Sequence, residues 1–160
     1  MTKHEIHQRF IDRLAEELAA ITAAAKNSIA TATSQEHQAE SKYDTFSLES
    51  SYLARGQAKR VEELTYALER LQSLVLKELH DGDPIQHSAL VRLETGDGKK
   101  RTLFFCPAGG GEQIADAGED ISIITALSPL GKAMLGKAAG ATFNFAVGKV
   151  THAYTVVSVE

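Results

Sequence analysis

The feature that most constrains the fold is a heptad repeat in the first half of the chain. Apolar residues step by three, four, three and four positions, at Val61, Leu64, Leu68, Leu71 and Val75. This spacing is typical of a coiled-coil seam, in which the apolar side chains of one helix pack against a second helix. The chain therefore needs another apolar helix face to cover this one.

An earlier segment provides that face. Apolar residues recur every three to four positions, with charged residues between them, at Ile6, Phe10, Leu14, Leu18, Ile21 and Ala25. The pattern predicts an amphipathic helix from Ile6 to about Ile29, and the heptads predict a second helix from about Phe46 to Leu79. Helices of about 25 and 35 residues span roughly 37 and 52 Å. Because each carries an apolar seam, we predict an antiparallel helical hairpin.

The reversal between the two helices is predicted within "NSIATATSQE" (27–36). Asn, Ser and Thr side chains compete with the helical backbone for hydrogen bonds, so a run of them favours a helix end. Thr33 followed by Glu36 fits a capping box, and the second helix is expected to begin as early as Ser34. Gly56 lies inside this helix at a cost of about 1 kcal/mol relative to alanine, and we predict a tolerated surface position.

Three carboxylates mark this end of the hairpin. Glu36, Glu40 and Asp44 recur at intervals of four, and no basic residue shares their spacing. On one helix they would stack on one face, where like charges repel by about 0.2–0.5 kcal/mol per pair. Two interpretations stay open. The acids form a solvated helix start next to the positive end of the helix dipole, or they hold or complete a divalent-metal site, since Mg²⁺ favours one or two carboxylates and keeps several waters.

The second half of the chain has the period of strands. "ALVRLET" (89–95) and "KRTLFF" (100–105) flank "GDGK", a hairpin signal because Asp-Gly accepts positive φ angles. "GEDISIIT" is a further predicted strand, "PLGKAMLG" a short helix opened by Pro129, and "ATFNFAVG" and "THAYTVVSVE" a closing pair. The fold class is therefore α+β, with a helical hairpin domain at 1–80 and an α+β domain at 84–160.

Charge and composition exclude several classes of function. Seventeen Lys and Arg against twenty-one Asp and Glu give a formal net charge of −4, so DNA binding is expected to be weak or absent. No apolar run reaches the ~20 residues that cross a bilayer, and the charged N-terminus lacks the apolar core of a secretory signal. We therefore expect a cytoplasmic protein without membrane contact.

Rival active sites are poorly supported. Cys106 is the single cysteine and lies in the apolar run "TLFFCPA", so it is interpreted as a small core residue and not as a nucleophile. The six histidines are scattered and do not predict a zinc site. "CPAGGGEQ" has the glycines of a phosphate-binding loop but not its Gly-Lys-Ser/Thr ending, so a surface turn is predicted there.

A helical hairpin with acidic residues near its tip, followed by a domain ending in "ITALSPLGKAMLGKAAGATFNFAVGKVTHAYTVVSVE", resembles the bacterial Gre family of transcript-cleavage and elongation factors. The most specific part is Ser128-Pro129-Leu130-Gly131-Lys132-Ala133, with Gly136-Lys137 and then Gly140, which is similar to the C-terminal signature of the family. "AESKYDT" and "SYLARGQAKRVEEL" are similar to the region from the hairpin tip down the second helix. The resemblance covers almost the whole chain.

The resemblance implies a specific mode of action. The coiled coil would enter the secondary channel of RNA polymerase, where Glu36, Glu40 and Asp44 are the candidates for holding a Mg²⁺ ion shared with the polymerase. The C-terminal domain, FKBP-like in fold, would dock at the channel mouth through Ser128, Pro129, Leu130, Gly131 and Lys132. The polymerase itself would then cleave backtracked RNA, so the factor would not be an enzyme, would bind no cofactor tightly and would contact the nascent RNA only indirectly.

Two other functions stay open. The protein could occupy the channel as an inhibitor or modulator of transcription that does not stimulate cleavage, and a cleavage assay separates this regulator from a cleavage factor. A peptidyl-prolyl isomerase is suggested only by the expected fold of the second domain. Fold alone is weak support for an activity, and 6% aromatic residues with no Trp make an aromatic-lined proline pocket improbable.

Overall fold

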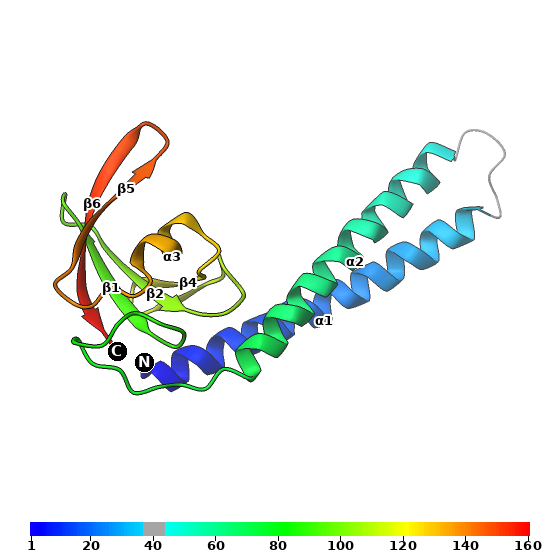
Figure 1. The fold of residues 1–160 in the computed structure, drawn as a ribbon. Helices are drawn as coiled ribbons and strands as arrows, with labels where there is room; N and C mark the ends of the chain where they lie inside the picture. The colour runs from blue at the N-terminus through cyan, green and yellow to red at the C-terminus, as the bar shows by residue number, and fades with distance from the viewer. Residues whose placement is uncertain (37–43) are drawn as a thin grey trace. The chain divides into compact units, whose positions relative to one another are not determined.

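The computed structural model describes the backbone of residues 1–36 and 44–160 and the side chains of residues 1–24, 26–27 and 55–160. Two long helices, α1 (Lys3–Glu36) and α2 (Asp44–Gln72), precede a mixed sheet and a short helix (Figure 1). The later elements are β1 (Leu90–Thr95), β2 (Lys100–Phe105), β3 (Gln113–Asp116), β4 (Glu119–Ile124), α3 (Pro129–Met134), β5 (Thr142–Val147) and β6 (Val150–Val159). The predicted α+β class, with helices first and a sheet domain second, is confirmed.

The chain forms two compact units. One contains Met1–Ile11 together with Glu69–Glu160, and the other is Asp12–Leu68. The first turns of α1 and the last turn of α2 thus belong to the same unit as the sheet. The predicted domains at 1–80 and 84–160 are instead divided where the sequence pattern changes from helix to strand.

The hairpin unit contains the middle parts of both helices. Arg60 Nη2 of α2 lies 2.7 Å from Glu17 Oε1 of α1, and the two helices run side by side in opposite directions (Figure 1). Leu14 and Leu64 are fully buried, while Val61 and Leu68 are half-buried. The apolar seam therefore exists, and Leu64 is its best-covered heptad position in this unit. Gly56 is exposed with open space around it, as predicted.

Helix α1 begins before the first apolar residue of its repeat because of a capping box at Thr2 and Glu5. The Thr2 N–H donates to Glu5 Oε2 at 2.7 Å, and the Glu5 N–H donates to Thr2 Oγ1 at 3.3 Å. These bonds satisfy amide groups that a helix start leaves without partners. The hydrogen bond from the Thr2 backbone is the main cause that lowers the pKa of the Glu5 carboxyl below its usual value.

The predicted reversal at 27–36 is wrong, because α1 continues to Glu36 and α2 starts at Asp44. Propensity differences of Ser, Thr and Asn from alanine are below about 0.7 kcal/mol per residue, and Ala30 and Ala32 favour the helix. A hydroxyl inside a helix can also bond back to the preceding turn. Thr22 does so in α1, where its Oγ1 donates to the Leu18 carbonyl at 2.6 Å.

Helix α2 ends at Gln72, so its predicted extension to Leu79 and the seam position at Val75 are also wrong. The side chain of Val75 is 75% exposed. Beyond the helix, some backbone N–H groups donate to side chains and not to helical carbonyls. The Lys77 N–H donates to Ser88 Oγ at 3.0 Å, and the His80 N–H donates to Asp83 Oδ2 at 2.9 Å. These partners make an irregular backbone stable where periodicity predicted another two turns of helix.

The sheet has the strand order β3-β4-β2-β1-β6-β5, and β2 pairs with β4 in parallel while the other neighbours are antiparallel. The predicted "GDGK" turn joins β1 to β2, with Gly98 at φ 81°. Strand β3 was not predicted. It is four residues long and only Ile114 within it is buried and apolar, so it carries almost no periodic signal.

Both faces of the sheet are apolar. One carries the cluster that includes Leu93, Leu103, Phe105 and Val156, and Leu130 and Met134 of α3 belong to it. Phe104 points to the opposite face, because successive side chains of a strand alternate. There its ring stacks on Phe10 of α1 with centroids 6.2 Å apart, and it meets His7 edge-on at 6.1 Å.

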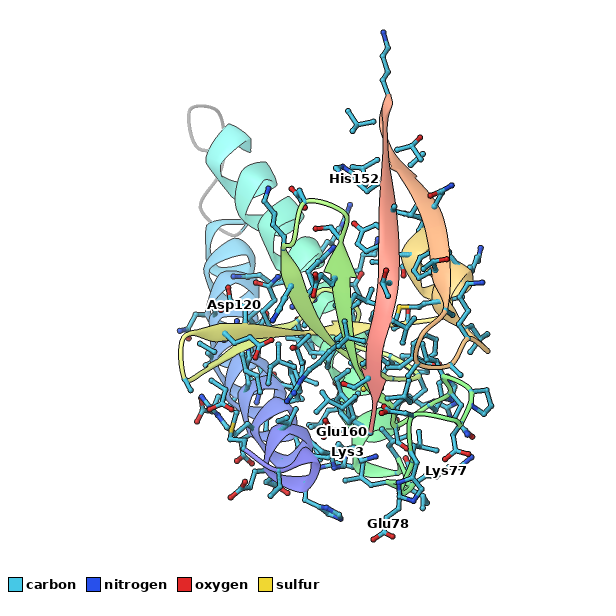
Figure 2. The ribbon with its side chains drawn as sticks, turned by 90° about the vertical axis from the view of Figure 1, so that its left-hand side faces the viewer. Lys3, Lys77, Glu78, Asp120, His152 and Glu160 are labelled. Carbon is cyan, nitrogen blue, oxygen red and sulfur yellow. The ribbon has the colours of Figure 1, made fainter. Side chains whose placement is uncertain are left out.

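Polar contacts fix the first turns of α1 in the sheet unit. Arg9 Nη1 donates to the Ala115 carbonyl of β3 at 3.1 Å, and the terminal ammonium group of Met1 lies 3.0 Å from Asp116 Oδ2. His7 Nε2 lies 2.7 Å from the Leu71 carbonyl, and Lys3 Nζ donates to the carbonyl of Lys77 (Figure 2). Burial is the main cause that lowers the pKa of the Lys3 ammonium group.

Truncating the seam should destabilise the protein in proportion to burial. We expect Leu64→Ala to cost about 2–4 kcal/mol, the usual range for a buried leucine, and the half-buried Leu68 to cost less. The exposed Glu62→Ala in the same helix is the control and should change stability by less than about 0.5 kcal/mol. Thermal and urea unfolding measure all three, and equal effects for Leu64 and Glu62 would refute the seam.

Candidate functional site

The predicted carboxylates lie at the ends of two helices. Glu36 is the last residue of α1 and Asp44 is the first residue of α2. Glu40 falls outside the described residues, as do the side chains of Glu36 and Asp44. The expectation that all three acids stack along one face of one helix is therefore wrong. Glu36 and Asp44 instead lie at the ends of two different helices, and the role of all three acids stays a prediction.

The rival sites do not assemble in the part of the chain that the structure describes. Cys106 is fully buried, and burial raises the pKa of its thiol well above the ordinary value, so the reactive thiolate is disfavoured. Among the described residues no group of three His, Cys, Asp or Glu side chains could hold a metal ion. The structure thus offers neither a cysteine nucleophile nor a zinc centre within those residues.

The glycine-rich "CPAGGGEQ" segment is a structural turn, as predicted. Its Cys106 N–H donates to the Ile124 carbonyl at 2.9 Å, and its Gly111 N–H donates to the Ile123 carbonyl at 3.0 Å. The Glu112 carbonyl accepts the Ile123 N–H at 2.8 Å. These bonds connect the segment to β4, and they occupy two N–H groups that a phosphate-binding loop would direct at the phosphate.

Ser128 opens helix α3. Its backbone is extended, and its Oγ accepts a hydrogen bond from the Gly131 N–H at 3.0 Å. The same hydroxyl donates to the Thr125 carbonyl at 3.0 Å. Pro129 follows at the first helical position, where its missing N–H costs nothing and its fixed φ suits the helix. Ser128 and Pro129 together determine where this six-residue helix begins.

Gly131 is required by a close approach of the backbone. A Cβ atom at this position would lie 1.8 Å from the Thr125 carbonyl oxygen and 2.9 Å from Ser128 Oγ. No side chain can occupy that space unless the loop before α3 moves. Leu130 and Met134, on the inward side of the helix, are buried in the core cluster.

The five predicted polymerase-binding residues therefore divide into two groups. Ser128, Leu130 and Gly131 build the helix and its packing, while Pro129 and Lys132 are exposed. Sequence reasoning missed two exposed apolar neighbours, Leu127 at 83% and Leu135 at 47% exposure. We define the α3 surface as Leu127, Pro129, Lys132 and Leu135.

A local signal could have identified Leu127. An apolar residue immediately before an N-cap usually packs against the fourth residue of the helix, in a hydrophobic staple. Counting from the N-cap Ser128, that fourth residue is Lys132. Its charged side chain is not the apolar partner that Leu127 would need for a staple. Leu127 is thus left in water although complete burial of a leucine is worth about 1.5–3 kcal/mol.

A side chain at position 131 should disrupt the loop and helix around α3. We expect Gly131→Ala to destabilise the protein by about 3 kcal/mol or more, because the added Cβ overlaps a backbone carbonyl oxygen. Gly56→Ala is the matched control. Its Cβ meets open space in an exposed helix, so it should stabilise by up to about 1 kcal/mol. Denaturant unfolding of both variants checks the contrast, and a neutral Gly131→Ala would contradict the close approach.

Comparisons with known proteins give the following matches. No curated protein sequence matches the chain. Among solved structures, GreA factor homolog 1 of Thermus thermophilus is 19% identical, with 94% of each chain covered and a TM-score of 0.38. The Thermus aquaticus counterpart is 19% identical over 93% of this chain and 92% of the other, at a TM-score of 0.40. A transcription elongation factor GreA/GreB from Nitrosomonas europaea is 18% identical over 64% of this chain and 90% of the other, at 0.37.

The family comparison is specific to the second half of the chain. Residues 81–160, half of the sequence, match the model of the C-terminal domain of the transcription elongation factors GreA and GreB. This region contains the sheet and the α3 segment described above. No helix among the described residues has the length and apolar character needed to cross a membrane. The chain belongs to the GreA/GreB family of transcription elongation factors.

Proposed function

We propose that this protein binds RNA polymerase, inserts its helical hairpin into the secondary channel and stimulates cleavage of backtracked RNA by the polymerase. The observation that carries the proposal is the combination of acidic residues at the adjoining ends of α1 and α2 with a C-terminal half that matches the GreA/GreB model. A long two-helix element with acids at its end suits a channel that leads to a metal-dependent active site. The factor acts on the nascent RNA indirectly, through the polymerase.

The acids would act as metal ligands. Carboxylate oxygens are preferred by Mg²⁺, and Glu36, Glu40 and Asp44 are the residues that would hold an ion shared with the polymerase. A bound Mg²⁺ in such a site can activate water and stabilise negative charge on a phosphate. The role of this chain is to carry the carboxylates to that place, and α1, with 34 residues, is about 51 Å long.

The α3 surface would bind the rim of the channel. Leu127 and Leu135 offer apolar area, and Lys132 offers a positive charge beside them. Ser128, Leu130 and Gly131 support this surface from within, so the sequence signature contributes to binding mainly by holding the α3 segment in shape.

The alternative is a regulator that occupies the same channel without stimulating cleavage. The structural feature that favours it is that Glu36 ends α1 whereas Asp44 begins α2, so the single helix with all three acids that the spacing predicted does not form. A single assay distinguishes the two functions. Binding with shortening of the RNA in a stalled complex supports the cleavage factor, and binding without shortening supports the regulator.

Neutral isosteres of the acids should separate metal binding from polymerase binding. We expect Glu36→Gln, Glu40→Gln or Asp44→Asn to leave the affinity for polymerase nearly unchanged. For the acid that meets the metal, the rate of RNA cleavage should fall about 10- to 100-fold, which corresponds to about 1.4–2.8 kcal/mol of barrier. Extra Mg²⁺ should restore part of the rate, because an amide oxygen is a weaker ligand than a carboxylate.

The control for these variants is Glu62→Gln, which neutralises an exposed acid of α2 within the described part of the hairpin. It should change neither binding nor cleavage. If a variant that combines Glu36→Gln, Glu40→Gln and Asp44→Asn stimulates cleavage as well as the parent, the acids are only solvated residues near the helix ends.

Removing apolar area from the α3 surface should weaken polymerase binding without affecting the fold. We expect Leu127→Ala to lower the affinity about 5- to 30-fold, equivalent to about 1–2 kcal/mol, with an unchanged melting temperature. Leu130→Ala should instead lower the melting temperature, because Leu130 is buried. Val75→Ala, at another exposed apolar residue, is the control for surface hydrophobicity. Equal binding by Leu127→Ala and the parent would place the contact elsewhere.

A further inference from the structure

The parallel strands β2 and β4 diverge at their first residues. Their pairing covers 102–105 and 121–124, beginning with Thr102 opposite Ile121. Before that point each strand is held by its other neighbour: Lys100 and Arg101 pair with β1, while Glu119 and Asp120 pair with β3. The divergence is therefore built into the backbone of the sheet.

Two basic and two acidic residues flank the point where the strands diverge, but they form no ion pair with one another. Extending the parallel register backwards would place Arg101 opposite Asp120 and Lys100 opposite Glu119. Cross-strand pairs of opposite charge stabilise a sheet. Of the ion pairs within 4.0 Å that the described residues form, none joins these four side chains. The divergence of the two strands thus separates the basic residues of β2 from the acidic residues of β4.

The divergence opens a cavity of about 500 Å³. Its lining includes Gln113 and Ser122 in addition to the four charged residues. A second cavity of about 320 Å³ shares Lys100, Arg101, Thr102 and Glu119 with it and adds Arg92. Figure 2 labels Asp120 near the turn between β3 and β4. The size falls within the range of small-molecule sites, although the lining is more polar than usual.

One polar contact positions the acidic side. The hydroxyl of Thr102, a buried residue, donates to Glu119 Oε1. Glu119 is thus directed back toward β2, while Asp120 is exposed on the other side of its strand. Arg101 lies opposite Asp120 in the extended register, so these two residues share one face of the sheet and have the chemistry to meet one ligand that carries both signs.

We propose that this cavity binds a small zwitterion, with its anionic group at Arg101 and its ammonium group at Asp120. A simple anion would meet the repulsion of Glu119 and Asp120, and a simple cation that of Lys100 and Arg101. The opposed charges are more than 4.0 Å apart, which leaves room for a ligand whose two charged groups are separated by a short chain. Exposed ion pairs contribute at most about fivefold each, so the affinity for a minimal ligand lies in the millimolar range.

The test is NMR titration of the full-length, ¹⁵N-labelled protein with three matched probes. They are 4-aminobutyrate, which carries both charges, butyrate, which carries only the anion, and n-butylammonium, which carries only the cation. We expect 4-aminobutyrate to shift the amide resonances of 100–102 and 119–122 and to bind at least fivefold more tightly than either other probe. Equal shifts with butyrate or n-butylammonium, or no shift with any probe, would overturn the proposal.

Two variants test the assignment of the charges. Arg101→Gln and Asp120→Asn should each weaken binding of 4-aminobutyrate about three- to fivefold, whereas Lys149→Gln, whose residue does not line the cavity, should not. Urea unfolding of the single and double variants tests the opposite view. If the effects of Arg101→Gln and Asp120→Asn on stability are strongly non-additive, the two residues pair with each other in solution and the proposed site is closed.

Discussion

A sheet that is apolar on both faces cannot leave either face in water, and this constraint organises the sheet unit. Leu103 and Phe105 of β2 point to one face, where Leu130 and Met134 of α3 belong to the cluster, and Phe104 between them points to the other. The first turns of α1 cover that second face, with Phe10 stacked on Phe104. The N-terminal residues of the chain are consequently part of a unit whose other residues begin at Glu69.

Because the first turns of α1 cover one face of the sheet, this helix belongs to both units. The contacts of Arg9 with Ala115 and of Met1 with Asp116 hold the start of α1 against β3. From Asp12 onward α1 belongs to the hairpin unit, where Leu14 is buried and Glu17 is paired with Arg60. A continuous helix thus connects the covered face of the sheet to the element proposed to enter the polymerase.

The α3 segment shows how a short signature can have a structural meaning and a functional one at once. Ser128 caps the helix, Leu130 is buried, and Gly131 allows the Thr125 carbonyl to approach. These roles would make the residues characteristic of the domain even if none of them touched a partner. The exposed residues beside them, Leu127 above all, are the ones available for contact, and a pattern search that weighs only the signature overlooks them.

The sequence by itself determined the elements whose side chains repeat. Heptads identified the second helix and its buried Leu64, strand-like runs and the Asp-Gly turn identified β1, β2, β4, β5 and β6, and the Pro129 start identified α3. Tertiary structure decided the rest: the ends of α1 and α2, the existence of β3, the separation of Glu36 from Asp44, and the exposure of Leu127. Periodicity reports only which residues are apolar. Helix ends, edge strands and surface positions depend on hydrogen bonds to residues distant in sequence, such as Lys77 to Ser88, and on what covers each face after folding.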